Sequence, residues 1–462
     1  MKIRKYIGDK AFYRMVLGVA LPIMIQNGIS TFVSMLDNIM VGRVGTEAMS
    51  GVSVVNQFLF IFNLLIFGAV SAAGIFMSQF HGQADREGER FTFRFKFLIC
   101  SAAGIIGIAV LWIFSDQLIS LFLGGSASDG DPALTLRLGR EYLYIMLIGL
   151  IPFVIANVYA SSMRETGDTL TPMAASIVSV VTNFVLNYLL IFGNFGLPEL
   201  GVRGAAIATV IARTAECLIL MIRTHSVPAK YAYIKGAFRS FYIPGKLFCE
   251  IVLRGLPLML NELFWSLSVT LTNQCYSTRG LDVVASQSIY TTIFDVFSVV
   301  YLAMGTAISI VVGNLLGAGE TEQAKDTDRK MIAFSVFCSA VTGILLTCFS
   351  GLFPRLYNTT DGVRDLASFM IIIAAAAMPF TAFTNAAYFT IRSGGQVMLT
   401  ILFDSVFMWT VVMPVCWSLT TFTQIGIRWL FVLTQFTEAT KSLLGYVLLR
   451  RGTWVRTLKM KQ

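Results

Sequence analysis

The sequence predicts an all-α polytopic membrane protein with twelve transmembrane helices, arranged as two six-helix lobes related by a parallel internal repeat. Three observations predict this class: the low charge of the chain, its twelve long apolar runs and the similarity of its two halves. Of the 462 residues, 56% are hydrophobic and 13% are charged. Because a soluble domain carries about 25% charged residues, this chain cannot cover its surface with polar groups.

Twelve apolar runs are each long enough to cross the hydrocarbon core of a bilayer as a helix. In the first half they lie near residues 15–41, 47–73, 93–115, 139–160, 170–192 and 203–222. In the second half they lie near residues 251–277, 284–312, 331–354, 365–390, 397–418 and 427–449. Turn-forming residues separate several of the runs, as in 124–132, 317–320 and 358–362.

The two halves of the chain align with each other. A shift of 235 residues lays 21–90 on 256–325, and a later shift of 228 residues aligns further positions. The matched pairs include Pro22 with Pro257, Gly82 with Gly317, Arg164 with Arg392, and Arg213 with Lys441. Since six spans return the chain to its starting side, the repeats are parallel. We therefore expect an N-terminal lobe at 1–228, a basic cytoplasmic connection at 229–250 and a C-terminal lobe at 251–462.

Lysine and arginine are distributed unequally between the two sides of the predicted membrane. Of the 35 basic residues, 25 fall on the side of the two termini and the connection, and 8 fall on the other. The positive-inside rule then places both termini in the cytoplasm. The net charge of +9 accordingly reflects topology and anionic lipid, and we expect no nucleic-acid partner.

Cysteine and histidine give no indication of metal or redox chemistry. The seven cysteines are scattered through apolar runs, and the two histidines are His81 and His225. No P-loop is present, so ATP is not expected to drive the protein. We expect no catalytic residues and no cofactor. An integral-membrane transferase, which needs a catalytic histidine or acidic pair, stays an unfavoured alternative.

Several segments resemble the multidrug and toxic compound extrusion transporters of bacteria. They are 20–22 (Ala-Leu-Pro), 37–42 (Asp-Asn-Ile-Met-Val-Gly), 164–168 (Arg-Glu-Thr-Gly-Asp), 204–209 and 312–319. The resemblance implies a multi-pass antiporter of the cell inner membrane that exports cationic, amphipathic compounds in exchange for protons or sodium ions. We expect it to be a monomer in the lipid bilayer. A lipid-linked precursor flippase of the same superfamily is the alternative, although fourteen spans and a cationic cavity would suit it better.

A charged group inside the membrane costs several kcal/mol and needs an explanation. Asp37 lies in the first span, either as an interfacial acid or as a titratable ion site. The resemblance implies the second, with Asn183, Asn187 and Thr209 as polar partners on spans five and six. Asn183 and Asn187 are four residues apart, so both amides share one helix face. If sodium is the coupled ion, Asp37 is where it would bind, and no other metal site is expected.

Three more acids fall within the predicted spans of the C-terminal lobe. Glu262 lies near the start of span seven, nearly a turn closer to the proline than the glutamate of several relatives. We expect it to be a cavity acid, and a structural acid that snorkels to the membrane surface is the alternative. Asp295 is central in span eight and has no neutralising neighbour on its helix, so we expect it to face a wet cavity or to be protonated. Asp404 in span eleven is interpreted either as the partner of a basic side chain or as a cavity acid.

Two opposite-charge pairs occupy the last span of each lobe. Arg213 with Glu216 and Glu438 with Lys441 are three residues apart, which lets side chains neutralise each other on a helix surface. We interpret both as structural ion pairs.

Overall fold

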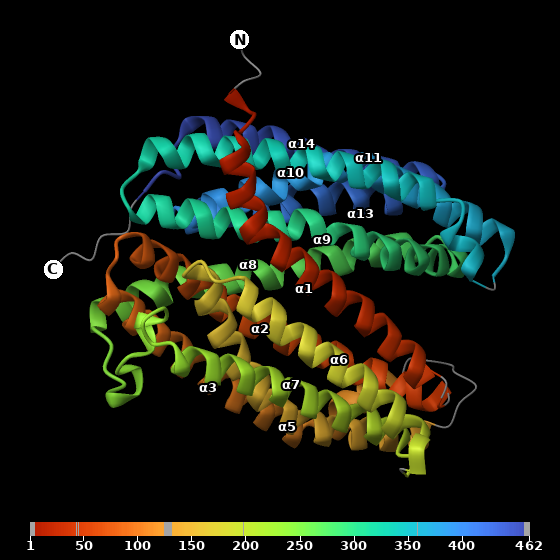
Figure 1. Ribbon diagram of the computed structural model, residues 1–462. Coiled ribbons are helices and arrows are strands. Elements are labelled where there is room, and N and C mark those ends of the chain that lie inside the picture. The colour runs from red at the N-terminus through yellow and green to blue at the C-terminus, as the bar shows by residue number, and fades with distance from the viewer. Residues whose placement is uncertain are drawn as a thin grey trace. The chain divides into compact units, whose positions relative to one another are not determined.

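The computed structural model describes residues 5–42, 44, 46–123, 132–196, 198–357 and 359–456. Within these residues the chain is helical almost throughout and has no β-strand (Figure 1). The first half forms α1 (Lys10–Gly42), α2 (Thr46–Gly82), α3 (Arg86–Ile113), α5 (Pro132–Glu165), α6 (Leu170–Phe192) and α7 (Gly201–Ser226). The second half forms α8 (Gly245–Ser277), α9 (Leu281–Gly317), α10 (Thr321–Phe349), α11 (Asp361–Ser393), a segment over 397–422 and α14 (Ile427–Arg451).

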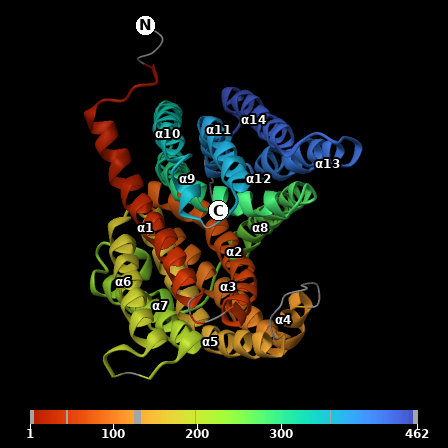
Figure 2. The ribbon, with the colours of Figure 1, turned by 90° about the vertical axis from the view of Figure 1, so that its right-hand side faces the viewer.

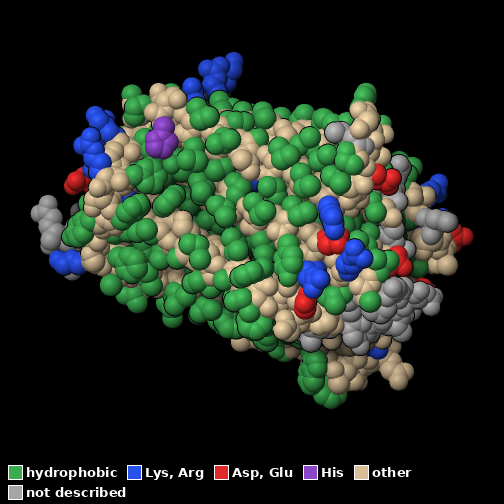
Figure 3. Space-filling model, turned by 90° about the horizontal axis from the view of Figure 1, so that it is seen from below, with side chains coloured by type: hydrophobic (Ala, Val, Ile, Leu, Met, Phe, Trp, Pro, Cys, Tyr) green, Lys and Arg blue, Asp and Glu red, His purple; other side chains and the backbone are tan. Residues whose placement is uncertain are grey.

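Ten helices among the described residues are long and apolar enough to cross a membrane. The other two of membrane length are α8, with 33 residues, and α14, with 25. At 1.5 Å per residue they extend about 50 and ~38 Å, enough to span the bilayer. Both carry charged side chains, including Glu262 and Lys441, which lower their hydropathy. Hydrophobic side chains cover most of the face in Figure 3, as expected for a surface in contact with lipid.

The eleventh membrane-length segment is not the regular helix that the sequence predicted. It begins as α12 (Val397–Ile401), passes through two π-helical stretches, Leu402–Val406 and Met408–Val412, and ends as α13 (Met413–Phe422). A π-helix has a wider turn, so it changes the direction of its side chains, and such turns occur frequently at functional sites. Asp404 lies in the first stretch. The short helix α4 (Ser115–Leu123) was also not predicted.

Proline residues lie inside four of the long helices. Pro22 in α1 and Pro257 in α8 hold matching positions in the repeat. Pro152 in α5 and Pro379 in α11 lie in corresponding helices of the two halves, one residue away from the 228-residue alignment. Each proline removes one backbone donor and favours a kink. Corresponding helices of the two halves therefore each contain a proline that interrupts the backbone hydrogen bonds.

The chain divides into two compact units, and they do not follow chain order. One unit contains the described residues of Met1–Met24, Ser78–Ala84 and Val252–Gln462, and the other contains Ile25–Met77 and Asp85–Ile251. In Figure 2, α9, α10, α11 and α14 group in the first unit, and α3, α5, α6 and α7 group in the second. The division into lobes at 228 and 251 stays a prediction.

Two repeat-matched glycines allow the ends of α2 and α9 to touch in the first unit. A Cβ atom on Gly82 would lie 2.0 Å from the backbone oxygen of Asn314, and one on Gly317 would lie 2.1 Å from that of Gln79. No side chain fits at such distances. The glycines are therefore required for this backbone contact.

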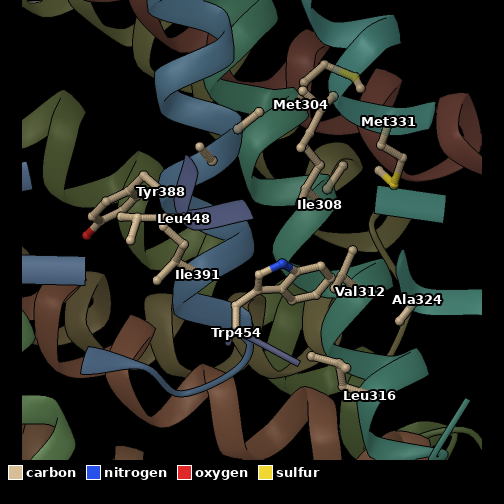
Figure 4. Packing of buried hydrophobic residues seen from close by; sticks show 14 of the residues in the cluster. Met304, Ile308, Val312, Leu316, Ala324, Met331, Tyr388, Ile391, Leu448 and Trp454 are labelled. Carbon is tan, nitrogen blue, oxygen red and sulfur yellow. The ribbon is translucent and has the colours of Figure 1, made fainter. Parts of the chain in front are cut away.

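The C-terminal segment packs into the core of the first unit. The Trp454 side chain is 3% exposed and lies among Val312, Leu316 and Ile391 (Figure 4). A Cβ atom on Gly394 would lie 1.7 Å from the backbone oxygen of Trp454. The chain after α14 thus packs tightly against the end of α11.

The connection after α7 is bound to the second unit by Arg94 of α3. Its guanidinium donates to the backbone oxygens of Gly236, Ala237 and Tyr242 at 2.9, 2.7 and 3.0 Å. One buried side chain therefore fixes a segment that has little regular structure of its own.

Candidate functional site

A chain of polar side chains joins α1, α6 and α7 in the second unit. Asn187 donates from Nδ2 to Asp37 Oδ1 at 2.6 Å and to Asn183 Oδ1 at 3.2 Å. Asn183 in turn donates from Nδ2 to Thr209 Oγ1 at 3.1 Å. The structure therefore brings together all four residues that the sequence predicted for this site.

Local helix geometry explains this arrangement. Asn183 and Asn187 are buried on one face of α6, one turn apart, at 6% and 1% exposure. Thr209 is anchored by donating to the Ala205 carbonyl of its own helix at 3.0 Å, which leaves an oxygen lone pair for the Asn183 amide. Each amide is thus oriented by its neighbour, and the last donor of the chain points at the carboxylate.

The arrangement places one acidic group, Asp37, against neutral amide donors. A carboxylate held in this way can carry a proton or coordinate a small cation through its oxygens. No group of three or more His, Cys, Asp or Glu side chains that could hold a metal ion occurs in the part of the chain that the structure describes.

Arg213 of the same unit does not lie in a simple pair with Glu216. Its guanidinium lies over the ring of Phe153, 4.7 Å from the centroid, and its buried Nη1 has no hydrogen-bond partner among the described residues. Glu216 is half-buried and interacts electrostatically with Arg164 as well as with Arg213. Arg213 therefore makes a cation–π contact, and its structural ion pair with Glu216 stays a prediction.

Glu262 of α8 is paired with a basic residue in the first unit. Arg392 Nη1 lies 3.1 Å from Glu262 Oε1, and Tyr388 donates its hydroxyl to the same oxygen at 2.6 Å. Arg392 also donates to the Tyr388 hydroxyl at 2.9 Å. The sequence had assigned Arg392 to a cytoplasmic loop, whereas its side chain is buried in the last turn of α11.

Asp404 is likewise paired, and its partner is Lys441 of α14. Lys441 Nζ lies 2.5 Å from Asp404 Oδ1, and Asn261 donates to Oδ2 at 2.9 Å. Of the two interpretations of Asp404, the structure therefore shows the basic partner. The predicted Glu438 partner of Lys441 cannot be compared, because the Glu438 side chain lies outside the described residues.

Asp295 of α9 differs from Glu262 and Asp404, because no ion pair in the described part of the chain neutralises it. Its side chain is exposed at the surface of the protein, and its carboxylate makes no hydrogen bond to a described residue. This placement agrees with the predicted absence of a neutralising neighbour. Its assignment as a cavity acid stays a prediction.

Two further acids, one half-buried and one buried, were missed by the sequence reasoning. Glu165 forms an ion pair with the fully buried Lys96, which also donates to Ser161 at 3.2 Å. Asp328 accepts from the Thr390 hydroxyl at 2.5 Å. Lys96 falls at the start of the span predicted near 93–115, and it was counted with the cytoplasmic basic residues. Its burial could have been inferred only from the apolar residues on either side of it.

A third cluster joins the loop after α5 to the connection after α7. Asp168 accepts hydrogen bonds from Lys230 at 2.7 Å, from Tyr231 at 2.5 Å and from the Thr171 hydroxyl at 2.7 Å. Burial alone would raise the pKa of Asp168, but these hydrogen bonds outweigh it and lower the pKa to about 2. The same contact raises the pKa of Lys230.

Known proteins resemble this chain in sequence over most of its length. The MatE family model matches residues 22–189 and 257–418, one match in each half. The probable multidrug resistance protein NorM of Thermotoga maritima is 25% identical over 419 residues, 88% of this chain and 86% of that protein. The probable multidrug resistance protein YoeA of Bacillus subtilis is 25% identical over 89% of this chain and 88% of that protein.

Solved structures share the fold. An outward-facing multidrug resistance transporter of the MATE family superposes with a TM-score of 0.86 at 19% identity, over 99% of both chains. A MATE in complex with MaL6 gives a TM-score of 0.86 at 18% identity, over 98% of both. These likenesses confirm the predicted fold class of twelve helices in two lobes. Because the family model covers most of the sequence in two matches, the chain belongs to the MatE family of multi-pass membrane multidrug transporters.

Proposed function

We propose that this protein is a secondary active antiporter that exports cationic, amphipathic compounds in exchange for protons or sodium ions, with Asp37 as the coupling residue. The observation that supports the proposal is the polar chain from Thr209 to Asp37. It positions one amide donor, 2.6 Å from the carboxylate, within helices that cross the membrane. Relatives named as probable multidrug resistance proteins agree with an exporter.

Exchange requires one group whose ion affinity differs between two states of the protein. A proton or sodium ion at Asp37 neutralises the carboxylate and competes with the Asn187 amide for its oxygens. Ion binding therefore changes the hydrogen bond that joins α1 to α6. A change in that contact is a direct means of biasing the packing of the two helices.

The substrates in this proposal are small organic cations, taken from the cytoplasm or the lipid. Asp295 is an exposed acid within α9, and an acid at a low-dielectric surface attracts cations strongly. We propose it as a substrate-attracting group. The protein acts as a monomer with both termini in the cytoplasm, and its reaction needs no catalytic residue and no cofactor.

The proposal is tested in proteoliposomes that contain the purified full-length chain. Efflux of a fluorescent organic cation is measured with a proton gradient, with a sodium gradient and with neither. Asp37→Asn fixes the neutral form, so we expect substrate binding to persist while gradient-driven efflux falls to background. Asp326→Asn is the matched control, because it removes an exposed acid that, among the described residues, pairs only with Lys330 one turn away.

Two results would overturn the proposal. Efflux that is independent of both gradients excludes ion exchange as the driving force. Normal gradient-driven efflux in Asp37→Asn removes Asp37 from the coupling step.

A further inference from the structure

Hydrogen bonds link Glu262, Arg392 and Tyr388 inside the first unit. Arg392 Nη1 lies 3.1 Å from Glu262 Oε1, and the Tyr388 hydroxyl donates to the same oxygen at 2.6 Å. The Arg392 side chain is 1% exposed and that of Glu262 is 14% exposed. The Glu262 carboxylate is thus in contact with a positively charged side chain of the protein itself, that of Arg392.

The two halves share the arginine, but only the second half has the acid that it contacts. Arg164 matches Arg392, and its Nη1 lies 3.4 Å from Oε1 of Gln26, next to the residue that matches Glu262. Arginine therefore contacts the first helix of each half, but it meets a neutral amide in one half and a carboxylate in the other. At this position, only the second half has a carboxylate that could hold a mobile cation.

We propose that Arg392 is a specificity-determining residue. Its guanidinium occupies the position at Glu262 where a free monovalent cation would otherwise bind, and so keeps that cation out. A guanidinium stays protonated at every physiological pH, so proton exchange cannot vacate the site. Being covalently attached, it competes with free ions at a high effective concentration. This inference goes beyond the proposed function and does not depend on it.

The ion pair between Asp404 and Lys441 provides a second instance in the same unit. Lys441 Nζ lies 2.5 Å from Asp404 Oδ1, and both side chains are buried. Two acids of this unit, Glu262 and Asp404, are thus each paired with a basic side chain of the protein, one on α11 and one on α14. Exchangeable ions are consequently excluded from both of them.

The test uses sodium ions as the probe and thermal unfolding of the purified full-length chain in detergent as the readout. All variants carry Asp37→Asn, so any response of the proposed coupling site is removed. Melting temperatures are compared in about 100 mM sodium chloride and in choline chloride, because a ligand that binds only the folded state raises the melting temperature. No transport measurement is involved, so failure here is distinct from failure of the proposed function.

In the Asp37→Asn parent and with Arg392→Lys, which keeps the positive charge, we expect no difference between sodium and choline. With Arg392→Gln we expect sodium to raise the melting temperature by about 2–4 °C. Adding Glu262→Gln to Arg392→Gln should abolish that rise, because the carboxylate that binds sodium is gone.

Two outcomes would overturn the proposal. One is an Arg392→Gln variant that responds to sodium no more than the parent does. The other is a parent whose sodium response disappears with the double substitution Glu262→Gln/Arg392→Gln. The comparison of the parent with Glu262→Gln/Arg392→Gln can be made even if Arg392→Gln alone does not fold. The double variant removes both charges of the pair and therefore leaves neither of them buried without a partner.

Discussion

The ammonium group of Lys441 lies 2.5 Å from Oδ1 of Asp404, so the last helix of the protein is joined to the π-helical part of the segment before it. Asn261 of α8 donates to the other carboxylate oxygen at 2.9 Å and accepts from the Ser405 hydroxyl at 2.7 Å. Both oxygens of Asp404 are therefore occupied, and three membrane-length segments meet at one neutral cluster. A buried charge is tolerated in the membrane when it is paired in this way.

Breaking this pair from one side should destabilise the protein strongly. We expect Lys441→Met to lower the free energy of unfolding by about 3–5 kcal/mol, because it leaves Asp404 charged and buried. The double variant Lys441→Met/Asp404→Leu should recover most of that loss. Thermal or denaturant unfolding in detergent measures both. Equal losses in the single and double variants would show that the pair does not stabilise the fold.

The Asn187 amide should affect the exchanged ion more than it affects folding. Asn187→Leu removes the donor to Asp37, and a hydrogen bond to a charged group contributes about 1.5–3 kcal/mol. We expect the ion concentration that gives half-maximal efflux to change by about tenfold or more. Asn194→Leu serves as the control, because that amide contacts only the Tyr188 carbonyl at the end of α6. An unchanged midpoint in Asn187→Leu would contradict the assigned contact.

Asp168 should make stability depend on pH in the acid range. Its pKa is lowered from 3.8 to about 2 in the folded protein, so the folded state favours the charged form. The stabilisation is then fully present above the unfolded pKa and is lost as the pH falls through the folded pKa. We expect Asp168→Asn to melt below the parent at pH 7, with the difference shrinking between about pH 4 and pH 2. A difference that is constant over this range would rule out the charge of Asp168 as its cause.

The glycine contact between α2 and α9 should not tolerate a side chain. We expect Gly82→Val and Gly317→Val each to lower the melting temperature and the monodisperse yield, because a Cβ atom would lie about 2 Å from backbone oxygens. Gly28→Ala is the control, since a Cβ atom there has no neighbour within 4 Å. That control should be neutral or mildly stabilising. Normal stability in both valine variants would mean that the helices do not approach this closely.

Membrane orientation can be tested with single cysteines in a background that lacks the seven native ones. A cysteine at Thr359 should react with an impermeant thiol reagent from outside the cell, and one at Ser240 should react only after the membrane is opened. A cysteine at Ser126 would serve as a second outside marker, although that residue lies outside the described residues. The reverse pattern would contradict the proposal that the connection is cytoplasmic.

Local pattern predicted where the long helices lie, and the family resemblance implied one of the polar clusters. Asn183 and Asn187 share a helix face because of their spacing, and the family resemblance connected them to Asp37. Neither argument depends on contacts between distant segments. The hydrogen bonds of 2.6 and 3.2 Å therefore agree with what spacing and resemblance implied.

The partners of buried charges could not be predicted in the same way. Arg392 lies 130 residues from Glu262 along the chain, and Lys441 lies 37 residues from Asp404. Sequence reasoning selected partners within one turn of a helix and so matched Lys441 with Glu438. Spacing along one helix carries no information about which helix packs against it.

The sequence by itself determined the class of this protein, because hydropathy, the charge distribution and the internal repeat are properties of the chain and the lipid alone. Only the tertiary structure decided which acids are already neutralised and which face an amide donor. The physical reason is that a charge inside the membrane takes its ionisation and its role from the groups within a few ångströms. Helix packing brings those groups together from distant parts of the chain, so Glu262 and Asp37, similar acids in the sequence, have different partners in space.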